Sequence, residues 1–194
     1  MLLKWGMDLL ADPRVYALQL MADTEAAAEV RTQGCPRCGG ALHAANYARK
    51  PRAGQAMLPT GYELRFSFCC ASDDCRKRRM PPSFRFLGRR VYVGAVVVLA
   101  TAMMHGVTRW RAARLRELTG ASLRTLTRWR RWWAETFPET PTWKQARGLV
   151  RTPVDETTLP LSLLNAFTGD GRERLMALLR LLLPLTTPAL AGRA

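Results

Sequence analysis

The chain has 194 residues, which is enough for one domain or two small ones with a sizeable core. Its hydrophobic fraction of 48% and charged fraction of 23% are typical of a globular protein and exclude a wholly disordered or collagen-like chain. The formal net charge is +15, so we expect a polyanionic partner, and nucleic acid before a membrane surface.

The positive charge is concentrated in the middle of the chain. Between Arg31 and Arg131 there are 21 basic and four acidic residues, a net charge of +17, whereas the remaining residues have a net charge of −2. Most of the basic residues are arginines, whose guanidinium groups bind phosphates and guanine edges through two hydrogen bonds. A GC-rich genome would also favour arginine, but it would spread the charge more evenly along the chain.

An N-terminal helical segment is predicted over residues 1–34. Asp12 and Pro13 are suited to the start of a helix, and Gly34 is suited to end one. Asp8 and Asp12 stand where a secretory signal would be basic and then apolar. We therefore predict no export signal, and a cytoplasmic protein whose cysteines are reduced.

The cysteines of residues 35–88 predict a small zinc ribbon. Cys35 and Cys38 are spaced so that both thiolates reach one metal ion from a tight turn, and Gly39 allows the left-handed backbone of such a turn. Alternating residues before the second cysteine group predict a strand with one apolar face, formed by Tyr62, Leu64, Phe66 and Phe68. The predicted zinc ligands are Cys35, Cys38, Cys70 and Cys75.

Three alternatives to this ligand set stay open. In the first, Cys69 replaces Cys70 as a ligand. In the second, His43 replaces one of the cysteines. In the third, no metal binds and the cysteines are free and buried. A site closed by four thiolates has no open position for water or substrate. A zinc ion in this set is therefore predicted to be structural.

A basic stretch follows the last cysteine. Four consecutive cations repel one another in the free protein, and phosphate groups relieve that repulsion when they bind. The alternative is a solvated loop. Arg85 lies between this run and two further arginines. The predicted phosphate-binding residues are Arg76, Lys77, Arg78, Arg79, Arg89 and Arg90.

Residues 89–137 predict a helical module. The uncharged stretch from Val91 to Thr108 is predicted to contain a buried helix, because its strongly apolar part is shorter than a membrane span. Two helices are predicted after it, from Thr108 to Leu118 and from Ser122 to Trp133, joined by a turn that contains Gly120.

The second of these helices has two different faces. Leu126, Trp129 and Trp133 recur at helical spacing and are predicted to face a core. A second row of residues at the same spacing, mostly arginines, is predicted to face solvent. A helix–turn–helix protein presents the helix that enters the major groove in this way. The residues of this row are Arg124, Thr127, Arg128 and Arg131. The alternative is that the two helices are amphipathic only because they pack for stability, with no role in binding DNA.

Leu118 to Ser122, followed by Leu126, Arg128 and Trp129, resembles the turn and second helix of helix–turn–helix segments in bacterial insertion-sequence transposases. The cysteine pattern is similar to the zinc ribbons that often precede such segments in these transposases and their accessory proteins, and together the two motifs cover about residues 35–135. The resemblance implies recognition of the DNA of a mobile element. It further implies base-reading or phosphate-binding roles for Arg124, Thr125, Thr127 and Arg128.

Residues 138–194 predict a linker and Leu-rich C-terminal helices, over about 160–167 and 171–183. The helices either complete the core by packing on residues 91–104, which we favour, or form the interface of a homodimer or a larger partner. The acidic residues are isolated, the two histidines are far apart, and there is no phosphate-binding glycine motif. We therefore expect no catalytic centre.

Together these patterns predict an α+β, mostly α chain, with a four-cysteine zinc ribbon followed by a helix–turn–helix module. The expected function is non-catalytic binding of duplex DNA, as an accessory or targeting subunit of a transposition or recombination system. A recombinase or transposase is the expected protein partner, and no membrane is involved. A stand-alone transcription regulator and an RNA-binding component of a ribonucleoprotein complex are the alternatives.

Overall fold

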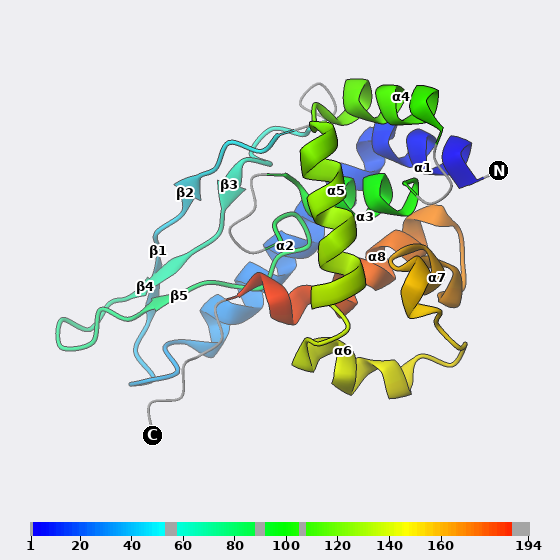
Figure 1. Cartoon of the computed structure of the whole chain (residues 1–194). Coiled ribbons are helices and arrows are strands. Elements are labelled where there is room, and N and C mark those ends of the chain that lie inside the picture. The colour runs from blue at the N-terminus through cyan, green and yellow to red at the C-terminus, as the bar shows by residue number, and fades with distance from the viewer. Residues whose placement is uncertain (1, 53–57, 88–91, 105–107, 188–194) are drawn as a thin grey trace.

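The computed structural model describes residues 2–52, 58–87, 92–104 and 108–187, and Figure 1 shows their arrangement. Helices form one body, and five short strands extend from it as an arm. The long helix α2 (Pro13–Gln33) passes from the helical body along this arm. Two separate hydrophobic cores correspond to these parts: a large one among the helices and a small one between α2 and the strands.

The N-terminal segment is helical, as predicted, but it forms two helices. α1 (Leu2–Ala11) ends before Asp12, and α2 (Pro13–Gln33) begins with a proline in its first turn. The Asp12 carboxylate caps α2 by accepting a hydrogen bond from the backbone N–H of Arg14 at 3.0 Å. Gly34, with φ +71°, ends the helix.

The strands of the arm form two small antiparallel sheets. β4 (Phe68–Cys70) lies between β1 (Leu42–Ala44) and β5 (Arg78–Arg79) in a three-stranded sheet. β2 (Tyr47–Ala48) pairs with β3 (Leu64–Arg65) in a two-stranded sheet. The arm is therefore held together by short pairings, and it buries few large apolar side chains.

The predicted apolar strand face from Tyr62 to Phe68 is only partly correct. Tyr62 and Phe68 are buried, but Leu64 is 38% exposed and its neighbour Arg65 is buried instead. The guanidinium of Arg65 donates a hydrogen bond to the carbonyl oxygen of Pro81 at 2.6 Å, so an arginine occupies an inward position that the alternation assigned to the outside. A partner 16 residues away decides this orientation.

The apolar stretch after residue 91 forms a core helix. Every residue of α3 (Gly94–Ala102) is buried. α3 contacts α1, α4 (Arg109–Thr119), α5 (Leu123–Arg131) and α8 (Gly171–Leu181). Its polar Thr101 hydroxyl donates to the carbonyl oxygen of Val97 at 2.7 Å, which satisfies the hydroxyl inside the helix. No helix in the described part of the chain is both long and apolar enough to cross a membrane.

Short helices follow the central region and close the large core. α6 (Pro141–Ala146) and α7 (Leu161–Ala166) precede α8 (Gly171–Leu181), which begins with a capping box of Asp170 and Glu173. The buried leucines of this part are Leu159, Leu163, Leu164, Leu175, Leu178, Leu179 and Leu182. The 3-10 segments are η3 (Arg147–Leu149), η4 (Glu156–Thr158) and η5 (Leu183–Thr186).

The favoured prediction for the Leu-rich helices is confirmed, because α8 packs on α3. A β-carbon placed on Gly94 of α3 would lie 3.2 Å from Leu179 of α8, so the two helices are in close contact. The buried leucines of α8 therefore belong to the chain's own core and do not form a free dimer surface.

A buried polar network joins α2 to the arm. Asp23 of α2 accepts hydrogen bonds from the Ser83 hydroxyl and the Phe84 N–H, both at 2.6 Å. It also forms an ion pair with Arg85 at 2.7 Å, in which both side chains are fully buried. The guanidinium of Arg85 donates further to the carbonyl oxygen of Tyr62 at 2.6 Å. Arg85 therefore holds the fold together and adds nothing to a basic surface.

Candidate metal centre and nucleic-acid interface

Four of the five cysteines meet at the end of the arm. Cys35 and Cys38 lie in the turn after α2, Cys70 ends β4, and Cys75 lies in the turn before β5. Their sulfur atoms all lie within 4.8 Å of one another. This is the set of cysteines that the spacing predicts.

The cluster has the size of a tetrahedral metal site. The sulfurs of Cys35 and Cys75 are 3.7 Å apart, and those of Cys38 and Cys70 are 3.4 Å apart. Metal–sulfur bonds of about 2.3 Å in a tetrahedron give sulfur–sulfur edges of about 3.8 Å. Four thiolates suit a soft or borderline ion and disfavour magnesium or calcium, which prefer oxygen ligands. The four residues therefore fit a metal ion.

Two adjacent glycines shape the first cysteine turn. Gly39 has φ +71° and donates its N–H to the carbonyl oxygen of Cys35 at 2.8 Å. A β-carbon on Gly40 would lie 3.3 Å from the sulfur of Cys70 and 3.4 Å from that of Cys38. Gly39 is therefore needed for backbone conformation, and Gly40 for the close approach of the sulfurs.

The second cysteine turn repeats this geometry with a different residue. Arg76 directly follows Cys75, as Gly39 follows Cys38, and it too has a positive φ, of 41°. The N–H groups of Cys75 and Arg76 both donate to the carbonyl oxygen of Ser72, at 3.1 and 3.0 Å. Backbone N–H groups also reach the thiols in both turns, from Arg37 and Cys38 to Cys35 and from Lys77 to Cys75.

The thiols have very different proton affinities. Hydrogen bonds from the backbone N–H groups of Arg37 and Cys38 favour the thiolate of Cys35 and lower its pKa to about 6. The N–H of Ser72 also favours the thiolate of Cys70, but burial and the neighbouring thiols outweigh it and raise the pKa to about 12. Four close thiolates would repel one another, so only a bound cation lets all four ionise together.

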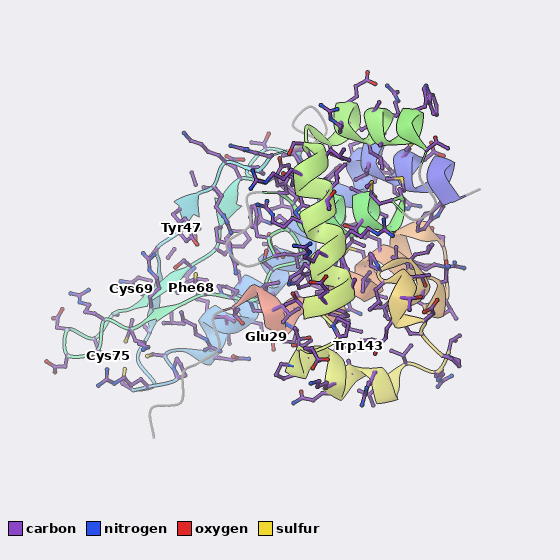
Figure 2. The ribbon with its side chains drawn as sticks, viewed as in Figure 1. Glu29, Tyr47, Phe68, Cys69, Cys75 and Trp143 are labelled. Atoms are coloured by element: carbon purple, nitrogen blue, oxygen red, sulfur yellow. The ribbon has the colours of Figure 1, made fainter. Side chains whose placement is uncertain are left out.

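The alternative ligands lie outside the cluster. The thiol of Cys69 donates to the carbonyl oxygen of Arg76 at 3.4 Å, and Cys70 is the member of the pair that joins the other sulfurs. His43 is exposed and lies opposite Cys69 across the β1–β4 pairing. Figure 2 labels Cys69 and Cys75 on the arm.

Two arginines of the basic run after Cys75 interact with the chain itself. The guanidinium of Arg79 donates to the carbonyl oxygen of Gly34 at 2.7 Å and to the side-chain oxygen of Gln33 at 2.6 Å. Arg79 therefore ties β5 to the end of α2. Arg76 forms an exposed ion pair with Asp73. The run is not a uniform row of free cations.

The other members of the run point to solvent. Lys77 and Arg78 are exposed, and the guanidinium of Arg78 lies 5.9 Å from the ring centre of Tyr47. Tyr47 is 38% exposed and was not predicted as a site residue, because only the folded strands bring it next to Arg78. Arg89 and Arg90 lie outside the described residues.

Two helices joined by a short turn follow the core helix, as predicted. α4 (Arg109–Thr119) ends at Gly120, which has φ +62°, and α5 (Leu123–Arg131) begins after Ser122. The Ser122 hydroxyl caps α5 by accepting a hydrogen bond from the N–H of Thr125 at 3.2 Å. A π-helical segment, η2 (Trp132–Thr136), continues α5.

The predicted inner face of α5 is confirmed, because Leu126, Trp129 and Trp133 are buried. Trp129 packs edge-on against Tyr92 with ring centres 4.8 Å apart, and Trp143 of α6 is also buried. Trp129, Trp133 and Trp143 are therefore part of the core. Trp110 of α4 is an exception, with 71% of its surface exposed.

The opposite face of α5 is exposed and basic. Arg124, Thr127 and Arg128 are exposed, and no ion pair in the described ranges includes either arginine. Arg131 is exposed too, but it lies 3.6 Å from the carboxylate of Glu135. Thr125 is half-buried and bound to the helix cap, so it is the least accessible of the predicted contacts.

No protein-family model matches this chain, and neither the curated proteins nor the solved structures contain a significant match to it.

Proposed function

We propose that this chain is a non-catalytic, zinc-containing protein that binds duplex DNA. Zinc is proposed for the cysteine cluster because four thiolates at tetrahedral spacing are the donor set of structural zinc sites. Residues Cys35, Cys38, Cys70 and Cys75 would hold the ion. A bound zinc ion would stabilise the arm, which has a core of only a few apolar side chains.

DNA is proposed as the partner because of the outer face of α5. The inner face of this helix is fixed in the core by Leu126 and Trp129, so the helix is firmly held. Its outer face turns Arg124 and Arg128 to solvent without ion-pair partners in the described part of the chain. A rigid helix that follows a tight turn and carries free guanidinium groups is how helix–turn–helix proteins contact the major groove. This exposed arginine pair is the observation that carries the proposal.

Within this proposal, the chain acts as an accessory or targeting subunit for a separate recombinase or transposase. The support is the resemblance of residues 35–135 to the DNA-binding segments of insertion-sequence transposases, together with the folding of this stretch into a cysteine arm and a helix pair. The arm and α5 would hold DNA, and the partner would supply the chemistry.

Fluorescence anisotropy with labelled duplexes tests the proposal. The wild type is expected to bind duplex DNA, and the double substitution Arg124→Ala and Arg128→Ala is expected to weaken binding by about 30-fold or more, at about 1–3 kcal/mol for each contact. Arg180→Ala on α8 removes one exposed charge from another helix and serves as the control. Equal affinities of the wild type and the double variant would refute the role of α5, and tighter binding to an RNA duplex of the same sequence would refute DNA as the partner.

A further inference from the structure

The three-stranded sheet of the arm has one covered face. Leu42 of β1 and Phe68 and Cys70 of β4 are buried against Ala27 and Val30 of α2. Successive residues of a strand point to opposite faces, so the residues between these buried ones point away from α2.

The uncovered face presents a row of three side chains, which we call the outer row: His43, Cys69 and Arg78. His43 lies opposite Cys69 in the β1–β4 pairing, and Cys69 lies opposite Arg78 in the β4–β5 pairing. Residues that lie opposite each other in antiparallel strands project on the same side of the sheet. His43 and Arg78 are exposed and Cys69 is half-buried, so the outer row is open to solvent.

Tyr47 extends the outer row with an aromatic ring. Its ring centre lies 5.9 Å from the guanidinium carbon of Arg78, and its hydroxyl donates to the sulfur of Met80 at 3.7 Å. These contacts fix the ring at the surface, yet 38% of Tyr47 remains exposed. Figure 2 labels Tyr47 and Cys69 on this part of the arm.

The charge around the outer row favours an anionic ligand. Between Cys35 and Arg79 there are nine basic and three acidic residues, a net charge of +6, although Arg65 is buried and Arg79 is bound to the end of α2. Of the acidic residues, Asp73 is already paired with Arg76. Arg78 takes part in none of the ion pairs found within the described ranges.

We propose that the outer row and Tyr47 form a site for single-stranded nucleic acid, with a base stacked on Tyr47 and adjacent phosphates bound by Arg78 and His43. Bases inside a duplex are stacked on each other and offer no free face to a surface tyrosine, whereas an unpaired base does. An open sheet face that carries cationic side chains beside an exposed aromatic ring suits this ligand. The site is separate from α5, and the proposal does not depend on duplex binding by that helix.

The test compares a labelled 12-nucleotide oligo(dT) strand with a labelled duplex, using the full-length protein. Tyr47→Ala is expected to weaken oligo(dT) binding by about fivefold or more, because one stacked base contributes at least about 1 kcal/mol. Arg78→Ala is also expected to weaken it, because it removes a contact to phosphate. Tyr47→Ala is expected to keep the duplex affinity of the wild type within about twofold, because paired bases offer no free face to its ring. Tyr47→Phe retains the ring and is expected to bind oligo(dT) as the wild type does.

Two controls keep the test decisive. Arg180→Ala removes the same charge as Arg78→Ala from the helical body and should leave oligo(dT) binding unchanged. Metal content and the melting temperature of each variant show whether the arm is intact. Unchanged oligo(dT) affinity in an intact Tyr47→Ala protein would overturn the proposal, and so would an equal loss of duplex and oligo(dT) binding. If the variant with Arg124→Ala and Arg128→Ala loses duplex binding but keeps oligo(dT) binding, that result supports the role of α5 and agrees with a separate site on the arm.

Discussion

At the scale of single residues, Gly40 is the glycine packed directly against the cysteine cluster. The sulfurs of Cys38 and Cys70 lie so close to it that any side chain must displace one of them. Metal affinity depends on such neighbours as well as on the ligands themselves. The two glycines after Cys38 therefore have different roles. Gly39 provides the positive φ of the turn, and Gly40 leaves room for the sulfurs.

Gly40→Ala is expected to weaken zinc binding by about tenfold, because the added β-carbon crowds two of the four sulfurs. Competition with a chromophoric zinc chelator measures this change. Gly148→Ala is the matched control, since a β-carbon there meets no atom within 4 Å. Equal zinc affinities of the two variants would contradict the close packing around Gly40.

The buried pair of Asp23 and Arg85 is expected to matter most for stability. Asp23→Ala leaves an uncompensated guanidinium in the interior, so the free energy of unfolding should fall by about 3–5 kcal/mol. Denaturant unfolding measures this loss. Asp73→Ala breaks an exposed ion pair with Arg76 and should change stability by at most about 1 kcal/mol. A similar small effect for both variants would show that the Asp23 pair is not buried in solution.

At the scale of elements, the helices follow from local signals. Asp12 and Ser122 are cap residues directly before α2 and α5, and both helices begin where these residues predict. The cysteine pattern likewise predicts the set Cys35, Cys38, Cys70 and Cys75, and the structure decides the choice between Cys70 and Cys69 that the sequence leaves open. The helix starts depend on neighbours along the chain, so the sequence alone suffices to find them.

The orientation of polar side chains in the arm could not be predicted in this way. Arg65 and Arg85 turn inward because Pro81 and Asp23, 16 and 62 residues away, supply acceptors for them. Tyr47 and Arg78 lie on strands of different sheets, β2 and β5, and become neighbours only in the folded arm. A basic run in the sequence therefore overestimates the basic surface, since partners that neutralise arginines are found only in the fold.

The cap of α5 provides a prediction at this scale. Ser122→Ala removes the acceptor of the Thr125 N–H and is expected to lower the free energy of unfolding by about 1 kcal/mol. Thr127→Ala, on the exposed face, should leave stability unchanged and should weaken only duplex binding. Thermal unfolding and anisotropy, measured on both variants, separate the two roles. A stability loss for Thr127→Ala equal to that for Ser122→Ala would contradict this division.

At the scale of the whole molecule, two cores of unequal size should respond differently to loss of metal. The core of the arm contains Cys35 and Cys70 themselves, whereas the helical core is built from α1, α3, α5 and α8. Removal of the metal with a chelator is expected to abolish amide-exchange protection of β1 and β4 and to preserve that of α3 and α8. Hydrogen–deuterium exchange measures both regions at once. Uniform loss of protection would show that the two cores fold as one unit.

The salt dependence of duplex DNA binding tests the central claim of a metal-stabilised scaffold that turns arginines toward phosphates and bases. For the zinc-loaded wild type, the logarithm of the binding constant should fall linearly with the logarithm of salt concentration, because bound cations displace counterions. The slope should be smaller in magnitude by about two for the protein with Arg124→Ala and Arg128→Ala. A binding constant independent of salt, or an unchanged slope in the double variant, would contradict the account.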